Sequence, residues 1–383
     1  MIILWLIFMF LIFGCLGVNY FFARIIARKP WNLRIDRNYK PKISIVVPTY
    51  NEREIIKYKL KNLFKLEYPR HLMEIIFVDS GSTDSTVDFI KKFSDAHPYM
   101  NIKIIEENER KGKSAALNLA LKSCTGEVII VSDADCFWPS DILSRSLPYL
   151  ADPTVGAISG PKKLLNPKDS WVTKCEDLYL QSVNLVKLSE SKRSSTILFE
   201  GGFSAYKKEA LTQFDPYNTG SDDCGTVIDI LRRKYRAIMV PEAEFYTTFP
   251  KTLKEKLGIK IRRASQLLKL FKMYIKFLFK KEIGVGKAVV VKNLILYFVM
   301  PLAFFIFISS TVYLFFSYPY ASFLLLLLLL PKVRMYVFEA TINCVVLMMA
   351  IVVGIFGKNF IIWNQPRDRI LLTEKMLVQR DLI

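Results

Sequence analysis

Cysteine is scarce and scattered in this sequence. None of the six cysteines among 383 residues belongs to a C-x-x-C pair, and Cys15 and Cys344 lie inside apolar runs. This distribution excludes the closely spaced ligands of a structural zinc site and the disulfide framework of a small secreted domain. It is typical of a domain that works in a reducing compartment.

Acidic residues are also in deficit. The chain has 35 aspartates and glutamates against 54 lysines and arginines, which gives a net charge of +19. Such an excess suggests a polyanionic partner: nucleic acid, an anionic membrane surface or phosphate groups. No nucleic-acid-binding motif is recognisable, and basic residues gather instead beside apolar segments, after residue 23 and over residues 251–281. We therefore expect a membrane and phosphates as partners, and no nucleic acid.

The apolar residues, 52% of the chain, are concentrated near its two ends. Residues 2–23 carry no charge and are long enough to cross a bilayer. A cleaved signal peptide would need a basic start and a small-residue cleavage site, whereas no charged residue precedes Arg24. The pattern favours a retained transmembrane anchor over residues 1–28, followed by basic residues on the cytoplasmic side.

The C-terminal apolar region, residues 286–358, contains two stretches that could span a membrane, 289–317 and 337–357. The ten apolar residues 321–330 are too few for an upright span and favour a re-entrant or interfacial placement. Basic residues in the tail, 359–383, indicate a cytoplasmic end. Three spans satisfy that condition, whereas a fourth would place the tail outside.

Residues 251–285 are basic and amphipathic, with leucine, isoleucine and phenylalanine between lysines and arginines. Helices of this kind often lie in the membrane interface. The alternative is a helix that packs its apolar face on the core of the neighbouring domain, and the sequence leaves both open.

Residues 40–250 show an α/β pattern. Short apolar runs predict buried strands, and segments with apolar residues at helical spacing separate them. The expected strands are 43–47, 74–78, 102–105 and 128–131, and the expected helices are 52–66, 86–93 and 114–122. This alternation predicts βαβ units and a mainly parallel sheet, with ligands bound beyond the carboxyl ends of the strands.

Two aspartates, Asp133 and Asp135, follow the last of these strands directly. Burying carboxylates at a strand end is costly unless a ligand occupies the site. Carboxylates separated by one small residue can bind a divalent ion together with a diphosphate, and Mg²⁺ or Mn²⁺ prefers such oxygen ligands. Taken alone, the same pattern occurs in ordinary surface turns.

Four motifs in order carry a family resemblance: ISIVVPTYNE (43–52), FVDSGSTD (77–84), RKGKSAALN (110–118) and DAD (133–135). In letters, order and spacing they resemble the inverting family 2 glycosyltransferases over about residues 42–250. The resemblance implies an α/β fold of the GT-A type, with a Rossmann-like, mixed but mainly parallel sheet. Transmembrane and interfacial helices would accompany this catalytic domain.

The resemblance also implies roles for individual residues. Asp135 would bind the Mn²⁺ or Mg²⁺ ion. Tyr50 would lie near the base of the nucleotide, Glu52 near its ribose, and Asp79 at the base edge. A basic, glycine-containing loop suits phosphates, and carboxylates accept hydrogen bonds from sugar hydroxyls. The implied nucleotide-sugar site is Pro48, Tyr50, Glu52, Asp79, Arg110, Lys113, Asp133 and Arg263.

Two later motifs would form the acceptor side. FEGGFSAY (199–206) resembles the family's acceptor loop, with Gly201 and Gly202 allowing close backbone approach; a plain turn is the alternative. In GSDDC (220–224), Asp223 matches the catalytic base, and Asp222 stands where the family has glutamate. The alternative is an acidic pair that favours the start of a helix.

One departure from the family is clear. Polymer-building members carry Q-x-x-R-W, whereas residues 260–266 read KIRRASQ without a tryptophan. Arg262 or Arg263 could still reach the diphosphate. Together with the small number of spans, this departure weakens the interpretation as a processive synthase.

These observations predict an inverting, metal-dependent glycosyltransferase whose catalytic domain faces the cytoplasm. It would move a sugar from GDP-mannose or a UDP-sugar to a hydroxyl of a lipid-linked or glycolipid acceptor, with Asp223 as base. The alternatives are a polyprenyl-phosphate glycosyltransferase, a processive polysaccharide synthase and a catalytically inactive scaffold that binds sugar nucleotides.

Overall fold

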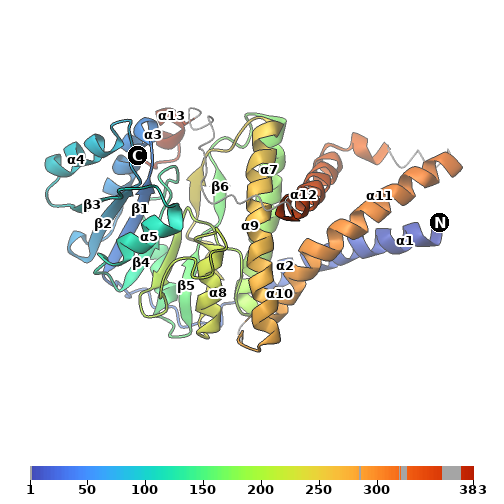
Figure 1. Cartoon of the computed structure of the whole chain (residues 1–383), viewed down its shortest axis with the longest axis horizontal. Helices are drawn as coiled ribbons and strands as arrows, with labels where there is room; N and C mark the ends of the chain where they lie inside the picture. Colours follow the sequence, from blue (N-terminus) through green and yellow to red (C-terminus); the bar gives the residue numbers. More distant parts are fainter. Residues whose placement is uncertain (1, 284–285, 319, 321–325, 356–371) are drawn as a thin grey trace.

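A computed structural model describes residues 2–283, 286–318, 320, 326–355 and 372–383. An α/β domain forms one side of the molecule, and long helices extend from it on the other side (Figure 1). The sheet has seven strands in the order β3-β2-β1-β4-β7-β5-β8 within the described residues. These strands are β1 (Ile43–Thr49), β2 (Met73–Asp79), β3 (Asn101–Glu106), β4 (Val128–Val131), β5 (Val155–Ser159), β7 (Ser204–Lys207) and β8 (Arg236–Met239).

The sheet is mainly parallel, which confirms the predicted fold class. Strands β1 to β4 pair in parallel, and β7 alone runs antiparallel to both of its neighbours. The four strands predicted from apolar runs all form, with ends within two residues of the expected ones. A second, two-stranded parallel sheet pairs β6 (Lys162–Leu164) with β9 (Phe245–Thr247).

Both faces of the large sheet are buried, because side chains alternate across a strand. In β1, Ile43, Ile45 and Val47 belong to one hydrophobic core, and Val46 belongs to the other. The helices of this domain are α3 (Arg53–Phe64), α4 (Thr86–Ala96), α5 (Lys113–Leu121), α6 (Ile142–Ser146) and α8 (Cys224–Arg232), with 3₁₀ turns η2 (Arg70–Leu72) and η3 (Leu147–Ala151).

Two long helices, α7 (Trp171–Arg193) and α9 (Leu253–Phe279), stand between the sheet and the apolar helices (Figure 1). A capping box between Ser170 and Thr173 begins α7, and the Thr252 side chain caps α9. Helix α9 covers most of the segment predicted to be interfacial. Its buried residues, Phe271 and others, join the second core of the sheet, so the helix packs on protein. Contact of its remaining surface with a membrane stays a prediction.

Three helical stretches within the described residues are long and apolar enough to cross a membrane: Trp5–Ala27, Lys287–Ser317 and Pro331–Ile351. They match the three predicted spans; residues 321–325 of the short apolar run lie outside the described residues. The elements are α1 (Ile2–Met9), π-helical η1 (Phe10–Gly14), α2 (Cys15–Ala27), α10 (Lys287–Leu294), π-helical η4 (Ile295–Val299), α11 (Met300–Ser317) and α12 (Pro331–Ile355).

The end of the chain returns to the catalytic domain, where α13 (Glu374–Val378) lies beside α3 (Figure 1). Leu377 and Leu382 are buried against Phe137, and the Asn62 side chain donates a 2.6 Å hydrogen bond to the Leu382 carbonyl oxygen. The described part of the predicted tail is thus docked on the domain. The basic residues of 356–371 lie outside the described residues.

Candidate active site

The predicted site residues lie at the carboxyl ends of β1, β2 and β4, at the starts of α5 and α8 and in the loop before β7, and Arg263 lies within α9. Strand β1 lies between β2 and β4 in the sheet, so the chain winds outward on both sides of β1. Ligands of open α/β sheets bind at such a switch in strand order. The TYNE motif (49–52) begins at the last residue of β1, and the Asp133-Ala134-Asp135 motif follows β4. The two motifs therefore lie at this switch in strand order.

The residues expected to bind the nucleoside form the first part of the site. The Arg110 guanidinium lies 3.8 Å from the centroid of the Tyr50 ring. Pro48 lies near the end of β1, and Glu52 is buried where α3 begins. The Asp79 carboxylate accepts hydrogen bonds from the Thr49 hydroxyl at 3.0 Å and from the backbone and hydroxyl of Ser82 at 2.7 and 2.5 Å. Asp79 therefore orders its own turn, whatever it contributes to binding a base.

An ion-paired cluster forms the second part, and Lys113, the first residue of α5, is its centre. The Lys113 ammonium lies 2.6 Å from Asp133 Oδ1 and 2.8 Å from Asp222 Oδ2. Burial opposes the charge, but the carboxylates of Asp133, Asp222 and Asp223 outweigh it and hold the pKa of Lys113 well above its usual value. Burial, with Asp223 and Asp133 nearby, raises the pKa of Asp222 to about 6 despite Lys113.

Asp223 is the N-cap of helix α8. Its geometry therefore agrees with the alternative of an acidic pair at the start of a helix. Its Oδ1 accepts hydrogen bonds from the Ser221 hydroxyl at 2.5 Å and from the Cys224 backbone at 2.6 Å. Among the described residues, no donor reaches its second carboxylate oxygen, which can therefore accept a proton from a substrate. Capping holds the carboxylate in place for such a role. The Gln266 side chain, from α9, donates to the carbonyl of Gly220 in the same loop.

The glycine loop passes close to this cluster. A Cβ atom on Gly201 would lie 2.8 Å from Lys113 Nζ and 3.3 Å from Asp133 Oδ2. On Gly202 it would overlap the Phe245 ring. Neither glycine has a positive φ, so close approach, and not unusual torsion, explains why glycine stands at both positions.

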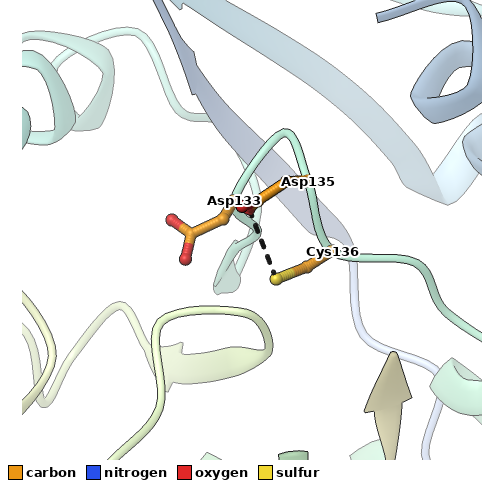
Figure 2. Close-up of side chains that lie close together, drawn as sticks. All are labelled: Asp133, Asp135 and Cys136. Atoms are coloured by element: carbon orange, nitrogen blue, oxygen red, sulfur yellow. Dashed lines mark hydrogen bonds between the residues drawn. The ribbon is translucent and has the colours of Figure 1, made fainter. Parts of the chain in front are cut away.

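The turn after β4 contains the residues that could hold a metal ion. Ligand atoms of Asp133, Asp135 and Cys136 lie within 4.8 Å of one another. The Cys136 thiol donates a hydrogen bond to Asp135, with 3.7 Å between the sulfur and Oδ1; Figure 2 marks this bond with a dashed line. Burial, with the carboxylates of Asp135 and Asp133, raises the pKa of Cys136 well above its usual value. Mn²⁺ and Mg²⁺ prefer carboxylate oxygens to sulfur, so the two aspartates are the ligands that fit such an ion.

Sequence analysis missed a buried lysine beneath this turn. Lys59 of α3 is fully buried, and its ammonium donates to the Ser132 hydroxyl at 2.6 Å and to the Cys136 carbonyl at 2.7 Å. It also lies 4.6 Å from the centroid of the Trp138 ring. Burial lowers its pKa to about 8. The signal was a lysine on the apolar face of a predicted helix, between Ile55 and Leu63.

The two arginines of α9 occupy different surroundings. Burial and the neighbouring Arg263 lower the pKa of Arg262 to about 10, and the carboxylates that oppose this shift are Asp222, Asp133 and Asp223. The charge of Arg262 therefore acts on the carboxylates of the Lys113 cluster. Burial alone would lower the pKa of Arg263, but the charges of Glu200, Glu176 and Asp223 outweigh it and raise that pKa.

Glu200, which precedes the two glycines, was also missed. Its carboxylate pairs with Lys187 of α7 at 2.6 Å. Burial alone would favour the neutral acid, but Lys187, Arg263 and Lys162 lower the pKa of Glu200 to about 2. No local pattern in the sequence marks this pairing, because Lys187 lies in the middle of a long helix.

Comparisons with known proteins agree with this geometry. Residues 41–264 match a family model described as "Glycosyltransferase like family 2". A poly-beta-1,6-N-acetyl-D-glucosamine synthase of Staphylococcus epidermidis is 28% identical over 214 residues, which are 54% of this chain and 50% of the relative. A synthase of the same name from Staphylococcus aureus (strain COL) is 26% identical over 238 residues, 58% of this chain and 55% of the relative. The chain thus spans about half the length of these curated relatives.

A solved structure matches nearly the whole chain. The mannosyltransferase PcManGT from Pyrobaculum calidifontis, in complex with GDP-Man and Mn²⁺, is 31% identical with a TM-score of 0.78. The alignment covers 93% of this chain and 99% of that one. The similarity therefore extends beyond the α/β domain to the helices that could span a membrane.

Proposed function

The chain belongs to the family 2 glycosyltransferases and acts on nucleotide sugars, and we propose that it transfers mannose from GDP-mannose to a lipid-linked acceptor hydroxyl at a membrane. The observation that carries the proposal is the grouping of Lys113, Asp133, Asp222 and Asp223 beside the Asp135 turn. It places a candidate general base next to candidate ligands for a metal and a diphosphate.

The choice of donor rests on the most extensive structural similarity. The P. calidifontis mannosyltransferase binds GDP-Man and Mn²⁺, and its similarity covers both the catalytic domain and the apolar helices. A UDP-sugar is the second candidate, because the staphylococcal relatives are N-acetylglucosamine polymer synthases by name. For the nucleoside, the proposed contacts are Pro48, Tyr50, Glu52 and Asp79.

The proposed reaction is a single displacement with inversion. Asp223 takes the proton of the acceptor hydroxyl as that oxygen attacks the anomeric carbon, and the bond to the nucleoside diphosphate breaks. Lys113 and Arg110 neutralise charge on the diphosphate. A divalent ion bound through Asp135 would supply further positive charge there.

The acceptor side would be formed by the loop at Gly201 and Gly202. Because glycine brings this backbone next to Lys113 and Asp133, an acceptor passing over the loop would reach the donor sugar closely. We propose that the catalytic domain faces the cytoplasm, since basic residues flank the apolar helices on that domain's side. An impermeant thiol reagent that labels a cysteine introduced at Arg34 in sealed cells would contradict this orientation.

The nearest alternative is a polymer synthase that uses a UDP-sugar, which the names of the staphylococcal relatives favour. A polyprenyl-phosphate glycosyltransferase is a further alternative, and it would need no base, because a phosphate acceptor is already ionised. Strong dependence of transfer on Asp223 therefore favours a hydroxyl acceptor.

A donor panel tests the proposal. The purified full chain is offered GDP-mannose, UDP-glucose and UDP-N-acetylglucosamine with Mn²⁺, Mg²⁺ or a chelator, and both binding and donor turnover are measured. We expect GDP-mannose to be preferred, and turnover to need the metal and to be lost in Asp135→Ala. Full turnover in chelator would reject the metal site, and preferential turnover of UDP-N-acetylglucosamine into long products would favour the polymer synthase.

A further inference from the structure

Lys59 of α3 lies fully buried beneath the turn that contains the candidate metal ligands. Its ammonium donates hydrogen bonds to the Ser132 hydroxyl at 2.6 Å and to the Cys136 carbonyl oxygen at 2.7 Å. Both partners are neutral, so they offset only part of the cost of taking the charge out of water. A methionine at this position would avoid that cost, so the stability of the core does not explain why a lysine stands here.

The two acceptors lie at opposite ends of the metal turn. Ser132 directly precedes Asp133, and Cys136 directly follows Asp135. A single ammonium therefore ties the chain before the two aspartates to the chain after them. The turn's own closing hydrogen bond is longer, 3.2 Å from the Cys136 backbone nitrogen to the Asp133 carbonyl oxygen. Lys59 consequently limits how far Asp133 and Asp135 can move relative to each other.

The same ammonium also connects the turn to the glycine loop. It lies 4.6 Å from the centroid of the Trp138 ring, and the Trp138 indole N–H donates to the Gly202 carbonyl oxygen at 2.8 Å. The Ser132 hydroxyl accepts from Lys59, so its own proton can be donated elsewhere. The acceptors within its reach are the carbonyl oxygens of Asp133 at 3.2 Å and Gly202 at 3.4 Å. Lys59 thus fixes the metal turn against the loop proposed to receive the acceptor.

We propose that Lys59 is a positioning residue for the metal site: by bonding both ends of the turn it holds Asp133 and Asp135 in the arrangement that binds a divalent ion. Lys59 acts through the turn and not by contact with the ion. Removing a residue that orients the ligands of a metal ion typically costs about 10–100-fold in metal affinity. The inference rests on the proposed function, because it assumes that the ion binds through Asp135.

The positive charge of Lys59 gives this role a test of sign. Like charges repel, so a purely electrostatic effect of the ammonium would weaken the binding of a cation at the turn. Removing the charge would then tighten the binding of Mn²⁺. Removing the two hydrogen bonds, by contrast, loosens the turn and weakens the binding of Mn²⁺. The direction of the change therefore decides between the two roles.

Titration with Mn²⁺ alone tests the role without requiring turnover. Mn²⁺ is added to the full chain, and the electron paramagnetic resonance signal of the free ion reports its dissociation constant. We expect Lys59→Met to raise this constant by about 10–100-fold, while the affinity for GDP or UDP in chelator is unchanged. Lys59→Gln, which keeps an N–H donor, should lose less. Lys57→Met is the matched control, because Lys57 is an exposed lysine of the same helix, and it should bind Mn²⁺ like wild type.

Ser132→Ala tests the hydrogen bond while the lysine stays in place. It removes one of the two acceptors of Lys59, and we expect Mn²⁺ affinity to fall by about fivefold. If Lys59 acts through this hydroxyl, the loss in the double variant Lys59→Met/Ser132→Ala is smaller than the product of the two single losses. Ser132→Ala also carries the test if Lys59→Met does not fold.

Three results would overturn the inference. Unchanged Mn²⁺ affinity in Lys59→Met and Ser132→Ala would show that the turn needs no such support, and tighter binding in Lys59→Met would assign the lysine an electrostatic role. An equal loss of nucleotide affinity in chelator would indicate a general structural role.

Asp135→Ala separates this inference from the proposed function. Mn²⁺ binding that is absent from wild type, or that survives in Asp135→Ala, would remove the metal site itself. Loss of Mn²⁺ binding in Asp135→Ala, with Lys59→Met unaffected, would remove only the role of Lys59.

Discussion

Two charge clusters of this molecule, one partly buried and one buried, are balanced differently. The catalytic cluster contains Lys113 with Asp133, Asp222 and Asp223, and the charge of Arg262 acts on the same carboxylates, so three carboxylates meet two cations. The anchor network contains Glu176 of α7, Lys256 and Lys260 of α9, and Glu339 of α12, so its charges are equal in number. Helix α9 contributes to the second cluster and contacts the loop of the first through Gln266.

This difference in charge balance matches a difference in role, because the first cluster serves the proposed catalysis and the second attaches an apolar helix. An excess of partly buried carboxylates is unfavourable until a cation or a proton arrives, which suits a site that binds a metal and moves a proton. Paired charges need no ligand. In the anchor network, Lys260 lies 3.2 Å from Glu339 and 2.9 Å from Asn343, which fixes the apolar helix α12 to the helices of the catalytic domain. Removing one charge from the catalytic cluster should therefore lower activity, whereas removing one charge from the anchor network should lower stability.

The largest expected effect is in the catalytic cluster. Asp223→Asn keeps the shape of the side chain but removes the proton acceptor, so transfer should fall by about 10²–10⁴-fold. Donor affinity should change little, because other residues hold the donor. The measurement is kcat beside donor Kd, with Asp222→Asn as the comparison. Near-normal turnover would remove Asp223 from the mechanism, and a larger loss in Asp222→Asn would identify the other carboxylate as the base.

In the anchor network, Lys256→Met should reduce stability and leave the chemistry of the folded protein intact. Removing one partner of a buried ion pair leaves an unpaired charge and typically costs about 3–5 kcal/mol. We expect a lower unfolding midpoint of the purified chain and an unchanged donor Kd at low temperature. Lys254→Met, an exposed lysine of the same helix, is the control. Equal midpoints for both variants would show that the network does not hold α12.

The sequence predicted the strands and turns around the catalytic cluster, whereas it did not predict the anchor network. Strands, turns and motifs such as Asp133-Ala134-Asp135 are local, so apolar runs and residue order reveal them. Lys256 and Glu339 lie 83 residues apart, and no local pattern connects them. The same lysines gave α9 the amphipathic composition of a membrane-surface helix, although Lys256 is fully buried.

The docked C-terminus and Lys59 were missed for related reasons. Asn62 bonds to both Trp138 and Leu382, contacts that only the folded chain brings together. Lys59 looked like one polar residue on a helix, and its hydrogen-bond partners lie in a turn 73 to 77 residues later. What sequence cannot supply is which charges the fold removes from water.

The third expected effect comes from adding a methyl group beside Lys113 in the catalytic cluster. In Gly201→Ala the new Cβ would lie 2.8 Å from Lys113 Nζ, the end of a flexible side chain, so this ammonium must move away from its place beside Asp133. We expect Lys113 to shift and kcat to fall by roughly 5–100-fold. The control is Gly258→Ala in α9, where no atom lies within 4 Å and alanine favours the helix. Similar kinetics in the two variants would mean that close approach at Gly201 is unimportant.

The smallest expected effect is the pH dependence of stability, and it compares Asp222 with Glu74, a carboxylate of β2. The folded-state pKa of Asp222 is raised to about 6, chiefly by burial, above its unfolded value of about 3.9. Its ionisation therefore opposes folding, and that penalty fades as pH falls from 7 toward 4. Burial of Glu74 acts in the same direction, but hydrogen bonds from Lys103, Ser44 and Thr125 outweigh it and lower its pKa to about 2.

Glu74 therefore stabilises the fold above pH 4.5, and this contribution is lost as pH falls toward 2. Between pH 7 and 5, linkage predicts that wild type gains about 1 kcal/mol relative to Asp222→Asn, while its advantage over Glu74→Gln stays constant. The measurement is the unfolding free energy of the three proteins in chelator, so that no metal perturbs Asp222. A difference between wild type and Asp222→Asn that does not change over this range would mean that Asp222 ionises at its ordinary pKa, because Lys113 then compensates fully for its burial.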